Sequence, residues 1–476
     1  MSTLFTAKEI QTIFHMSYLP QWEDVTGISI DTRTLKKGDL FIARKGNTED
    51  GAFFIKEALE KGAVGVLTET LCDDSSAAKQ LKVPSCDGAL DALATFARNR
   101  LDHMHADSTI IAITGSAGKT TVKEWLLYTL SPFLNTIASK ASYNNHIGVP
   151  YSVAHLTTTT QVGIFELGMN NPGEIAPLSL IARPDLAIIT SIGESHIGHL
   201  GTLEGIAEEK SEIFRGLNAT GTSIFPIDTP YKEYLLRKAD SLCLQHMWTF
   251  GENHGATACL LSFTPDVNEK IGGIVHARLY SEEITYAIAL HGDHNAHNSL
   301  VVLLVCKYIA ERYHLPLDPF IQRLSMFTAV EGRGARHVLP YKKGNILLID
   351  DAYNANPASM RAGLSTLVSL SCQGGGRKIA VLGDMKELGD DSSSYHRALS
   401  LVLQDVGVDL VFATGENMLE LWKILPEDKK GAYAPTVSEL LFEVLDHVRG
   451  HDIVFVKGSK SSHISKVVDA FLAQQK

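Results

Sequence analysis

The sequence predicts an α/β protein divided into three zones, and two patterns carry this prediction. Residues 346–473 alternate short apolar runs with helix-like segments, which is typical of a parallel, doubly wound sheet with helices on both faces. Earlier in the chain, a β-branched run at 109–114 leads through a glycine-punctuated loop into a helix-like segment. A chain of 476 residues also exceeds one hydrophobic core, so we expect about two to four domains.

The predicted elements separate the chain into domains of residues 1–85, 86–329 and 330–476. Val83-Pro84 marks the first boundary, because the residue before a proline is pushed into extended geometry. In the first domain we expect strands at 27–30, 40–43 and 64–67, and a helix at 52–61. In the other two we expect strands at 109–114, 162–165, 186–192, 346–349, 379–382, 410–413 and 453–456, and helices at 89–100, 122–130, 203–214, 358–370, 394–405, 437–448 and 463–473.

The composition is that of an ordinary globular protein, with 45% hydrophobic and 20% charged residues. A net charge of −11 and the lack of a basic tract argue against nucleic acid as a partner. Six cysteines without C-x-x-C pairs indicate neither a disulfide framework nor a zinc cluster, which favours reduced thiols. The sequence shows no signal pattern and no apolar run of membrane-spanning length. We expect a cytoplasmic monomer without a membrane span.

The strongest functional signal is the segment T-I-I-A-I-T-G-S-A-G-K-T-T at 109–121. A strand that feeds a tight loop and a helix directs backbone N–H groups to one point, where the helix dipole also favours an anion. Lys119 adds a charge for the outer phosphates, and the Thr120 hydroxyl adds a hard oxygen for magnesium. The spacing is a tighter variant of the general phosphate loop, and the alternative is a strand–turn–helix corner with an incidental lysine. We expect ATP to be bound by Gly115, Ser116, Ala117, Gly118, Lys119, Thr120 and Thr121.

A second signal is a lysine within an apolar helix face. The stripe of the predicted helix at 203–214 consists of Leu203, Ile206, Ala207, Ile213 and Phe214. Lys210 lies at its centre, while Glu208 and Glu212 face the opposite way. Because an ammonium is costly to desolvate, Lys210 either reaches solvent at an edge, pairs with a carboxylate or is chemically changed. A neutral lysine reacts with carbon dioxide to form a carbamate, which presents oxygens to a hard cation.

Two further side chains follow predicted strands. Glu166 closes the strand at 162–165, where nucleotide-hydrolysing folds place an acid beside magnesium, and the alternative is a solvated strand end. His196 follows the strand at 186–192 in a Gly/Ser-rich loop, at the sheet edge where ligands bind. A structural or exposed histidine is the alternative, and His199 nearby leaves the choice open.

Three later clusters resemble ligand contacts. Asn295 and Asn298 are spaced to face the same way at a helix start, where amides read an adenine edge or cap the helix. Arg333 lies between two glycines where the zones change, which suits a phosphate or a hinge. Asp350 and Asp351 end a strand before a helix that opens at Pro357, so a carboxylate there holds ribose hydroxyls or caps the helix.

Over nearly its whole length the chain resembles the Mur ligase family, the ATP-dependent amide ligases that build the peptide stem of bacterial peptidoglycan. The motifs that carry the resemblance are T-G-S-A-G-K-T-T, Y-N-N-H-I-G-V-P (143–150), E-L-G-M-N-N-P-G-E-I (166–175), H-I-G-H-L-G (196–201), E-E-K-S-E-I-F (208–214), H-N-A-H-N (294–298), D-D-A-Y-N-A-N-P (350–357) and V-L-G-D-M-K-E-L-G (381–389). The second and the last two resemble the last-acting type, which adds D-alanyl-D-alanine to UDP-N-acetylmuramoyl-tripeptide. The D-N-P-R signature of the type that adds the third residue is absent.

The resemblance implies a small α/β domain that binds UDP-sugar, a central P-loop ATPase with a mostly parallel sheet, and a Rossmann-like C-terminal domain that binds the dipeptide. It assigns Thr120, Glu166, His196 and a carbamylated Lys210 to magnesium, with two ions expected. It further assigns adenine to Asn295 and Asn298, phosphate to Arg333 and ribose to Asp351. The catalytic residues it implies are Lys119, Lys210, Arg333 and His196.

The resemblance also implies contacts for both substrates. The UDP-sugar would contact Asp31, Thr32, Arg33, Asp50 and Gly51, although Ala52 replaces the histidine that often follows. The dipeptide would contact Tyr353, Asn354, Asn356, Ser459 and Lys460. Lys460 stands where the family usually has arginine, so this side chain cannot form a bidentate ion pair with a carboxylate.

The implied reaction activates the tripeptide carboxylate as an acyl phosphate, which the dipeptide amine then attacks. The nearest competing functions share the ATPase core: a MurE-type ligase and folylpolyglutamate synthase. Two functions from different classes are a P-loop ATPase switch and a nucleotide-sugar binding module. The switch gives no reason for the lysine in the apolar stripe, and the binding module predicts no turnover.

Overall fold

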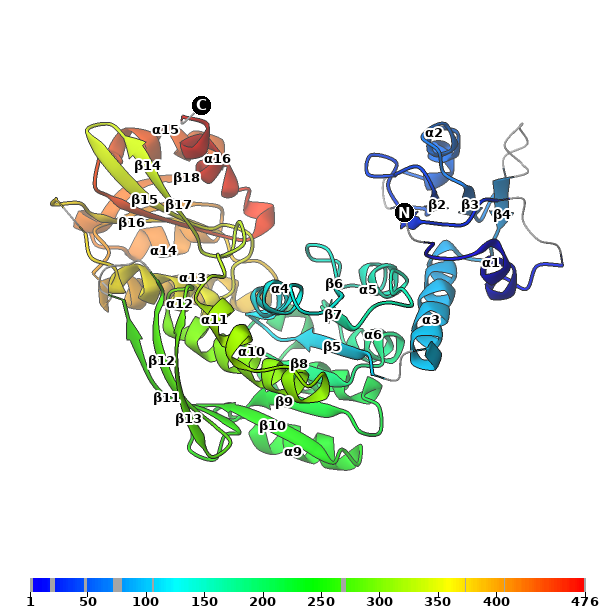
Figure 1. Ribbon diagram of the computed structural model, residues 1–476. Coiled ribbons are helices and arrows are strands. Elements are labelled where there is room, and N and C mark those ends of the chain that lie inside the picture. The colour runs from blue at the N-terminus through cyan, green and yellow to red at the C-terminus, as the bar shows by residue number, and fades with distance from the viewer. Residues whose placement is uncertain are drawn as a thin grey trace.

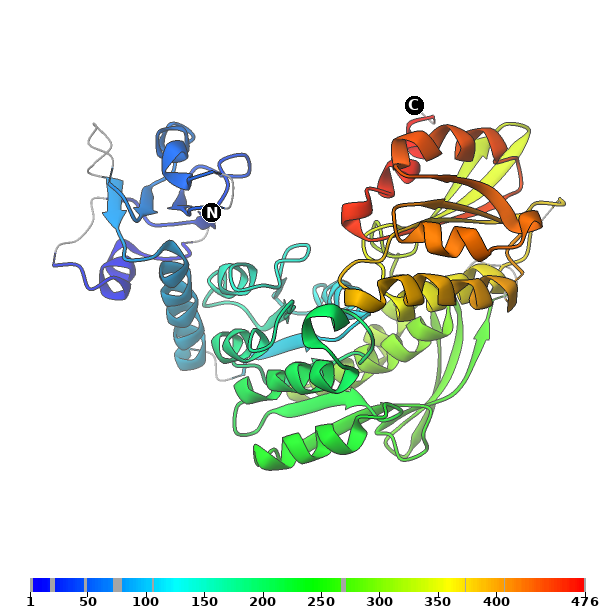
Figure 2. The ribbon, with the colours of Figure 1, turned by 180° about the vertical axis from the view of Figure 1, so that it is seen from behind.

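The computed structural model describes residues 3–17, 22–46, 49–71, 79–104, 107–266, 271–372, 374–405 and 407–474. These residues form three sheets of four, nine and six strands, each at the centre of its own lobe (Figure 1). Seen from behind, the N-terminal lobe stands at one end of the molecule, and the C-terminal lobe rests on the central one (Figure 2). No helix within the described ranges is both long enough and apolar enough to cross a membrane.

The N-terminal lobe is a parallel sheet in the order β1-β2-β3-β4. Its elements are α1 (Ala7–Ile13), β1 (Gly27–Ser29), β2 (Asp39–Ala43), the 3-10 helix η1 (Gly51–Phe54), α2 (Ile55–Glu60), β3 (Gly65–Thr68) and β4 (Gln80–Lys82). The helix expected at 52–61 therefore begins as a 3-10 turn, because Asp50 accepts a hydrogen bond from the Ala52 N–H and tightens the first turn. β4 was not predicted from the sequence.

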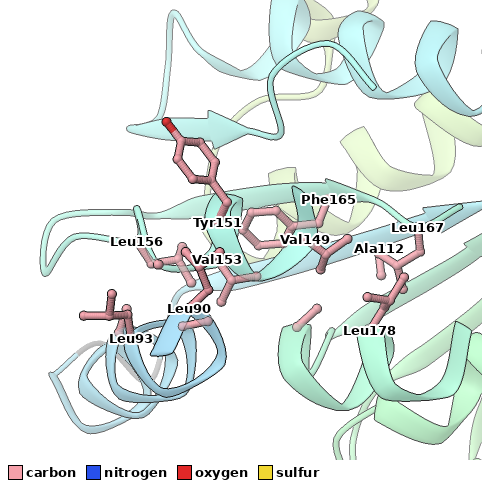
Figure 3. Close-up of a cluster of buried hydrophobic side chains, with 14 of the residues drawn as sticks. Leu90, Leu93, Ala112, Val149, Tyr151, Val153, Leu156, Phe165, Leu167 and Leu178 are labelled. Carbon is pink, nitrogen blue, oxygen red and sulfur yellow. The ribbon is translucent and has the colours of Figure 1, made fainter. Parts of the chain in front are cut away.

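Helix α3 (Cys86–Met104) connects the first two lobes. Its apolar residues pack against α5 (Gly148–Val153) and α6 (Ile175–Ala182) of the central lobe and against residues of the first lobe, in one continuous core. Figure 3 shows Leu90 and Leu93 of α3 beside Val153 and Leu156. Because α3 contacts both lobes, the boundary near residue 85 stays a prediction.

The central sheet has the order β13-β12-β11-β10-β9-β8-β5-β7-β6. Its strand pairs are parallel except for β11–β12 and β12–β13, as far as the described residues extend. Its strands are β5 (Thr109–Thr114), β6 (Thr136–Ala138), β7 (Val162–Glu166), β8 (Leu186–Ile189), β9 (Thr222–Pro226), β10 (His246–Gly251), β11 (Ala258–Pro265), β12 (Gly273–Leu279) and β13 (Glu282–Ile288). Its other helices are α4 (Lys119–Leu130), α7 (Ile197–Leu200), α8 (Leu203–Ser211), η3 (Glu212–Gly216), α9 (Lys232–Ser241), α10 (Asp293–Arg312) and α11 (Asp318–Leu324).

Strand β5 shows why the phosphate-loop segment folds as predicted. All six of its residues are buried, and alternate side chains enter the core under α5 and α6 and the core under α4 and α10. A strand covered on both faces reads as a continuous apolar run rather than as an alternating one. Two boundaries predicted here were wrong: the strand from 186 ends at Ile189, and the helix from 203 becomes 3-10 after Ser211.

The C-terminal sheet has the order β14-β15-β19-β16-β17-β18, and its edge strand β14 runs antiparallel to β15 while the remaining pairs are parallel. Its elements are β14 (Ala335–Tyr341), β15 (Gly344–Asp351), α12 (Pro357–Ser369), β16 (Lys378–Gly383), η4 (Gly389–Asp391), α13 (Ser392–Asp405), β17 (Leu410–Thr414), α14 (Met418–Ile424), η5 (Glu427–Lys429), β18 (Lys430–Ala434), α15 (Val437–His447), β19 (Ile453–Lys457), η6 (Lys460–Ser462) and α16 (Ser465–Ala473). Helices α12, α13 and α14 pack on one face, and α15 and α16 on the other. The predicted doubly wound α/β class is confirmed, with β14 and β18 as unpredicted edges.

Candidate active site

The phosphate-loop segment turns between β5 and α4 on two glycines with positive φ. Gly115 has φ +147°, and a Cβ there would lie 2.0 Å from Thr190 Oγ1. Gly118 has φ +85°, and a Cβ there would lie 2.7 Å from Asn298 Oδ1. Side chains are therefore excluded at both positions. The first turn of α4 presents N–H groups that no helical carbonyl can satisfy, which suits an anion.

Neighbouring segments hold the loop from several sides. Ser116 Oγ donates to the Gly193 carbonyl at 2.8 Å, and the Ala117 N–H donates to Ser191 Oγ at 2.9 Å. Asn356, from the C-terminal lobe, donates through Nδ2 to the Ser116 carbonyl at 3.3 Å. The loop is thus a contact point for the central and C-terminal lobes.

Two cavities meet at this loop, and both are lined by Ser116, Ala117 and Gly118. The larger, about 490 Å³, is also lined by Thr121, Asn295, Asn298, Asp351, Asn356 and Lys457. The smaller, about 210 Å³, is also lined by Lys119, Thr120, Glu166, His196 and Tyr353. Arg333 and Asn354 line both. The larger cavity on one side of the loop therefore contains side-chain amides and the Asp351 carboxylate. The smaller cavity on the other side contains the ionisable side chains of Lys119, Glu166 and His196.

Glu166 is a buried carboxylate rather than a solvated strand end. It closes β7 and is 1% exposed. Thr120 Oγ1 donates to Glu166 Oε2 at 2.8 Å, and Asn144 Nδ2 donates to Glu166 Oε1 at 2.8 Å. Lys119 donates to the Gly115 carbonyl. Burial lowers the pKa of Lys119, and Arg333 adds to that shift while Glu166 opposes it.

His196, rather than His199, lines the smaller cavity. It stands at the start of α7 with φ +62°, whereas His199 is exposed. His196 Nδ1 lies 2.5 Å from Oε2 of Glu387, which comes from the C-terminal lobe. The hydrogen bond with His196 lowers the pKa of Glu387. Glu387 had not been singled out from the sequence.

Lys210 is 1% exposed, which removes the alternative of a side chain that reaches solvent. Burial moves its pKa well below the ordinary value, the charge of Lys119 moves it further down, and Glu209 opposes this. Glu209 is itself engaged by the N–H groups of Gly173 and Ile175 at 2.7 and 2.8 Å. Across the described residues, the Lys210 ammonium has no hydrogen-bond or ion-pair acceptor.

The two glutamates expected on the opposite face of this helix differ in exposure. Glu208 is exposed, as predicted. Glu212 is half-buried instead, because it lies in the 3-10 turn that follows α8 and pairs with Lys238.

The amides at the start of α10 lie in the larger cavity but also bond each other. Asn298 Nδ2 donates to Asn295 Oδ1 at 3.2 Å, and Asn295 Nδ2 donates to the His291 carbonyl at 2.9 Å. Desolvation by the surrounding residues lowers the pKa of His294 beside them to about 4, and Lys457 adds to this shift. Asn298 is therefore the amide better placed to offer its oxygen to a ligand.

Arg333 and Asp351 both line the larger cavity, and each is held by a neighbour. The Arg333 guanidinium lies 4.4 Å from the ring centroid of Tyr353, whose hydroxyl is 2.5 Å from Ser142 Oγ. Asp351 forms a 2.6 Å ion pair with Lys457, a buried residue at the end of β19. Lys457 was missed as a site residue, although a lysine closing the apolar run I-V-F-V could have indicated it.

The residues expected to contact the dipeptide divide into two groups. Tyr353, Asn354 and Asn356 line the cavities, but the Asn356 amide is already bonded to the loop and caps α12. Ser459 and Lys460 line neither cavity. Ser459 Oγ accepts from the Lys386 N–H, and the Lys460 ammonium lies 5.5 Å from the Tyr353 ring centroid.

The residues expected to contact UDP-sugar lie in the N-terminal lobe, away from both cavities. Arg33 is exposed and pairs with Asp31 at 2.6 Å. Thr32 is buried, and the Asp50 carboxylate caps η1. Gly51 packs so closely on Arg44 that a Cβ would meet its carbonyl at 2.4 Å. Arg33 is the side chain of this group that is best placed to reach a ligand.

Comparison with known proteins places the chain in a family. Residues 24–100 match the Mur ligase family catalytic domain, 113–306 the Mur ligase middle domain, and 337–460 the Mur ligase glutamate ligase domain. The chain belongs to the Mur ligase family.

Within the family, several similar proteins carry the same name. The UDP-N-acetylmuramoyl-tripeptide–D-alanyl-D-alanine ligase of Bacillus subtilis (strain 168) is 32% identical over 458 residues, which cover 94% of each chain. A crystal structure of MurF from Acinetobacter baumannii superposes with a TM-score of 0.83 at 28% identity, covering 98% of this chain and 99% of that one. MurF ligase from Thermotoga maritima in complex with ADP gives a TM-score of 0.77 at 26% identity, covering 94% and 97%.

The glycine at the start of α4 gives a direct test of the loop. Gly118→Ala and Gly173→Ala each place a side chain at φ +85°, with similar strain of about 1–2 kcal/mol. Only the new methyl group of Gly118→Ala would clash with a neighbouring residue, Asn298, because nothing lies within 4 Å of a Cβ at Gly173. We expect calorimetry to show ADP affinity falling at least roughly tenfold, or about 1.4 kcal/mol, in Gly118→Ala alone. Equal affinities for the two variants would contradict the placement of nucleotide on this loop.

Proposed function

We propose that this protein is an ATP-dependent ligase that joins D-alanyl-D-alanine to UDP-N-acetylmuramoyl-tripeptide, the reaction named in its MurF relatives. The products are ADP, phosphate and the UDP-muramoyl-pentapeptide precursor of peptidoglycan. The observation that carries the proposal is the pair of cavities that share the phosphate loop, with Arg333 and Asn354 bordering both. A nucleotide bound along the loop would present its last phosphate to the side where two substrates can meet.

The nucleotide would lie with its base and ribose in the larger cavity. Asn298 would read the adenine edge, with Asn295 holding it in place through the 3.2 Å amide contact. Asp351 would hold the ribose, with Lys457 fixing its carboxylate. The phosphates would follow the loop to the first turn of α4, where Lys119 and Arg333 supply positive charge.

Magnesium fits the residues of the smaller cavity. The described residues contain no ready-made cluster of three or more His, Cys, Asp or Glu side chains. Magnesium is commonly held by one or two carboxylates, substrate phosphates and water, so Thr120, Glu166 and His196 suffice once ATP is present. When bound, the ion neutralises charge on the phosphate oxygens. We propose two such ions, the second served by a carbamylated Lys210.

The burial and lowered pKa of Lys210 support the proposed carbamate. A buried amine with a lowered pKa and no acceptor is largely neutral, so its nitrogen lone pair can attack carbon dioxide. The new N–C bond forms, one proton is released, and the product carries a negative charge on two oxygens. The negative charge of the carbamate would be attracted by the Lys119 ammonium, whereas a protonated Lys210 would be repelled by it.

The reaction would proceed in two displacements. The tripeptide carboxylate oxygen attacks the γ-phosphorus, and the bond to the β-phosphate oxygen breaks with its electron pair leaving on ADP. The dipeptide amine then attacks the acyl carbon, phosphate leaves, and the amine proton is lost. The protein contributes chiefly position and charge, through Lys119, Arg333 and the N–H groups of α4. Closure of the C-terminal lobe over the central lobe would keep water from the acyl phosphate.

The competing functions explain less of the molecule. A MurE-type ligase or folylpolyglutamate synthase would use the same core, but relatives that are 29–32% identical over 93–94% of this chain carry the D-alanyl-D-alanine ligase name. An ATPase switch would leave Lys210 unexplained. The cytoplasmic location and monomeric state stay predictions.

The first test omits each substrate in turn. With ATP, UDP-N-acetylmuramoyl-tripeptide and D-alanyl-D-alanine together, we expect phosphate release, and we expect it to fall to background without the dipeptide. Product analysis should show one pentapeptide for each phosphate. Equal phosphate release without the dipeptide would remove the ligase assignment and leave an ATPase.

The second test examines the carbamate. We expect Lys210→Ala to lose activity, and short-chain carboxylates such as acetate to restore part of it by supplying the missing oxygens. Lys123→Ala is the matched control, because Lys123 is equally buried but donates to the carbonyls of Ser139 and Ala141, both at 2.7 Å. Its defect should be insensitive to carboxylates. Full activity of untreated Lys210→Ala, or equal rescue of both variants, would refute the carbamate.

A further inference from the structure

The contact between His196 and Glu387 joins two lobes at a single ring nitrogen. His196 belongs to the central lobe, and Glu387 belongs to the loop between β16 and η4 of the C-terminal lobe. Oε2 of the carboxylate is 2.5 Å from Nδ1, and that nitrogen is fully buried. Because His196 also lines the smaller cavity, Nε2 is the ring nitrogen left to serve a ligand there.

Both residues of this contact have strained backbones. His196 has φ +62° and Glu387 has φ +63°, a region that costs about 1–2 kcal/mol for residues other than glycine. The Gly198 N–H donates to the Glu387 carbonyl at 3.0 Å. A Cβ on Gly198 would lie 2.4 Å from the Gly389 nitrogen, so the two loops meet backbone to backbone. The close approach of the two loops holds the Glu387 carboxylate against His196, although the Glu387 side chain is 42% exposed.

The loop that carries Glu387 is braced within its own lobe. The Met385 N–H donates to Nε2 of buried His396 at 3.0 Å, and the other ring nitrogen of His396 is 2.7 Å from the Ser392 carbonyl. The Lys386 N–H donates to Ser459 Oγ at 3.1 Å. The backbone that carries Glu387 is therefore anchored to the C-terminal lobe on its N-terminal side.

We propose that Glu387 is a positioning residue that prepares His196 for magnesium only when the C-terminal lobe is closed on the central lobe. The carboxylate accepts the Nδ1–H hydrogen bond, which selects that tautomer, fixes the ring and leaves the Nε2 lone pair for the cavity. Outer carboxylates of this kind raise the basicity of metal-binding histidines. The inference rests on the proposed function, because it takes the smaller cavity to be the magnesium site.

Lobe closure and metal affinity are then coupled through one side chain. The competing explanation is that Glu387 only helps the lobes to dock. The neighbouring ion pair between Arg361 of α12 and Glu194, at 2.9 Å, crosses the same interface without contacting the His196 ring. It supplies the matched control, since Arg361→Ala weakens docking but leaves the Nδ1 contact intact.

The test titrates Mn²⁺ into the full chain with a non-hydrolysable ATP analogue, followed by electron paramagnetic resonance. We expect Glu387→Ala to weaken Mn²⁺ binding by about 10–100-fold, the effect usual for outer partners of metal ligands. Glu387→Gln should lie between Glu387→Ala and the unaltered protein, because its amide oxygen still accepts the hydrogen bond without the charge. Arg361→Ala should bind Mn²⁺ within about twofold of the unaltered protein.

A second readout reports the tautomer directly. In ¹⁵N-histidine-labelled protein, we expect the His196 signals, identified by their loss in His196→Gln, to show protonated Nδ1 and to become a mixture in Glu387→Ala. Unchanged Mn²⁺ affinity in Glu387→Ala, an equal loss in Arg361→Ala, or an unaltered tautomer would each overturn the inference. If the unaltered protein itself binds no Mn²⁺ with nucleotide, the magnesium site of the proposed function fails first.

Discussion

The structure depends on one constraint: the short loop between β5 and α4 must approach its neighbours more closely than side chains allow. Gly115 lies against Thr190, and Gly118 lies against Asn298. Because the loop has no bulk at these points, the β8 loop, the start of α10 and the start of α12 can all reach it. The same lack of bulk leaves the helix N–H groups open to a phosphate.

This constraint explains why the two cavities differ in chemistry. On one side of the loop, the amides and the carboxylate suit a nucleoside. Asn298 is hydrogen-bonded to Asn295, and Asp351 is ion-paired with Lys457. On the other side, the buried Glu166 carboxylate and the partly buried Lys119 line the smaller cavity, where a bound cation and anion would offset their charges, whereas Lys210 lines neither cavity. The charged side therefore suits ATP with magnesium, whereas the amide side suits recognition. The contact of Asn356 with the loop carbonyl ties this arrangement to the position of the C-terminal lobe.

Local features of the site could be predicted from the sequence, and long-range ones could not. The phosphate loop depends on residues adjacent in the chain, and Lys210 was found because helical periodicity places it within an apolar stripe. The contacts of Glu387 with His196 and of Lys457 with Asp351 join distant segments, so the sequence does not show which residues meet, even where a local pattern singles out Lys457. Strands β12, β13 and β14 were missed for a related reason. Their burial is set by antiparallel neighbours in the sheet: β12 alternates buried and more exposed residues along its length, but its two adjacent apolar residues Ile274 and Val275 hide this alternation in the sequence.

The most direct measurement is a crystal structure of the protein with a non-hydrolysable ATP analogue and magnesium. The account predicts the base beside Asn298 in the larger cavity and the γ-phosphate at the first turn of α4, between Lys119 and Arg333 and open to the smaller cavity. A nucleotide bound elsewhere, or one whose γ-phosphate points away from the smaller cavity, would contradict it.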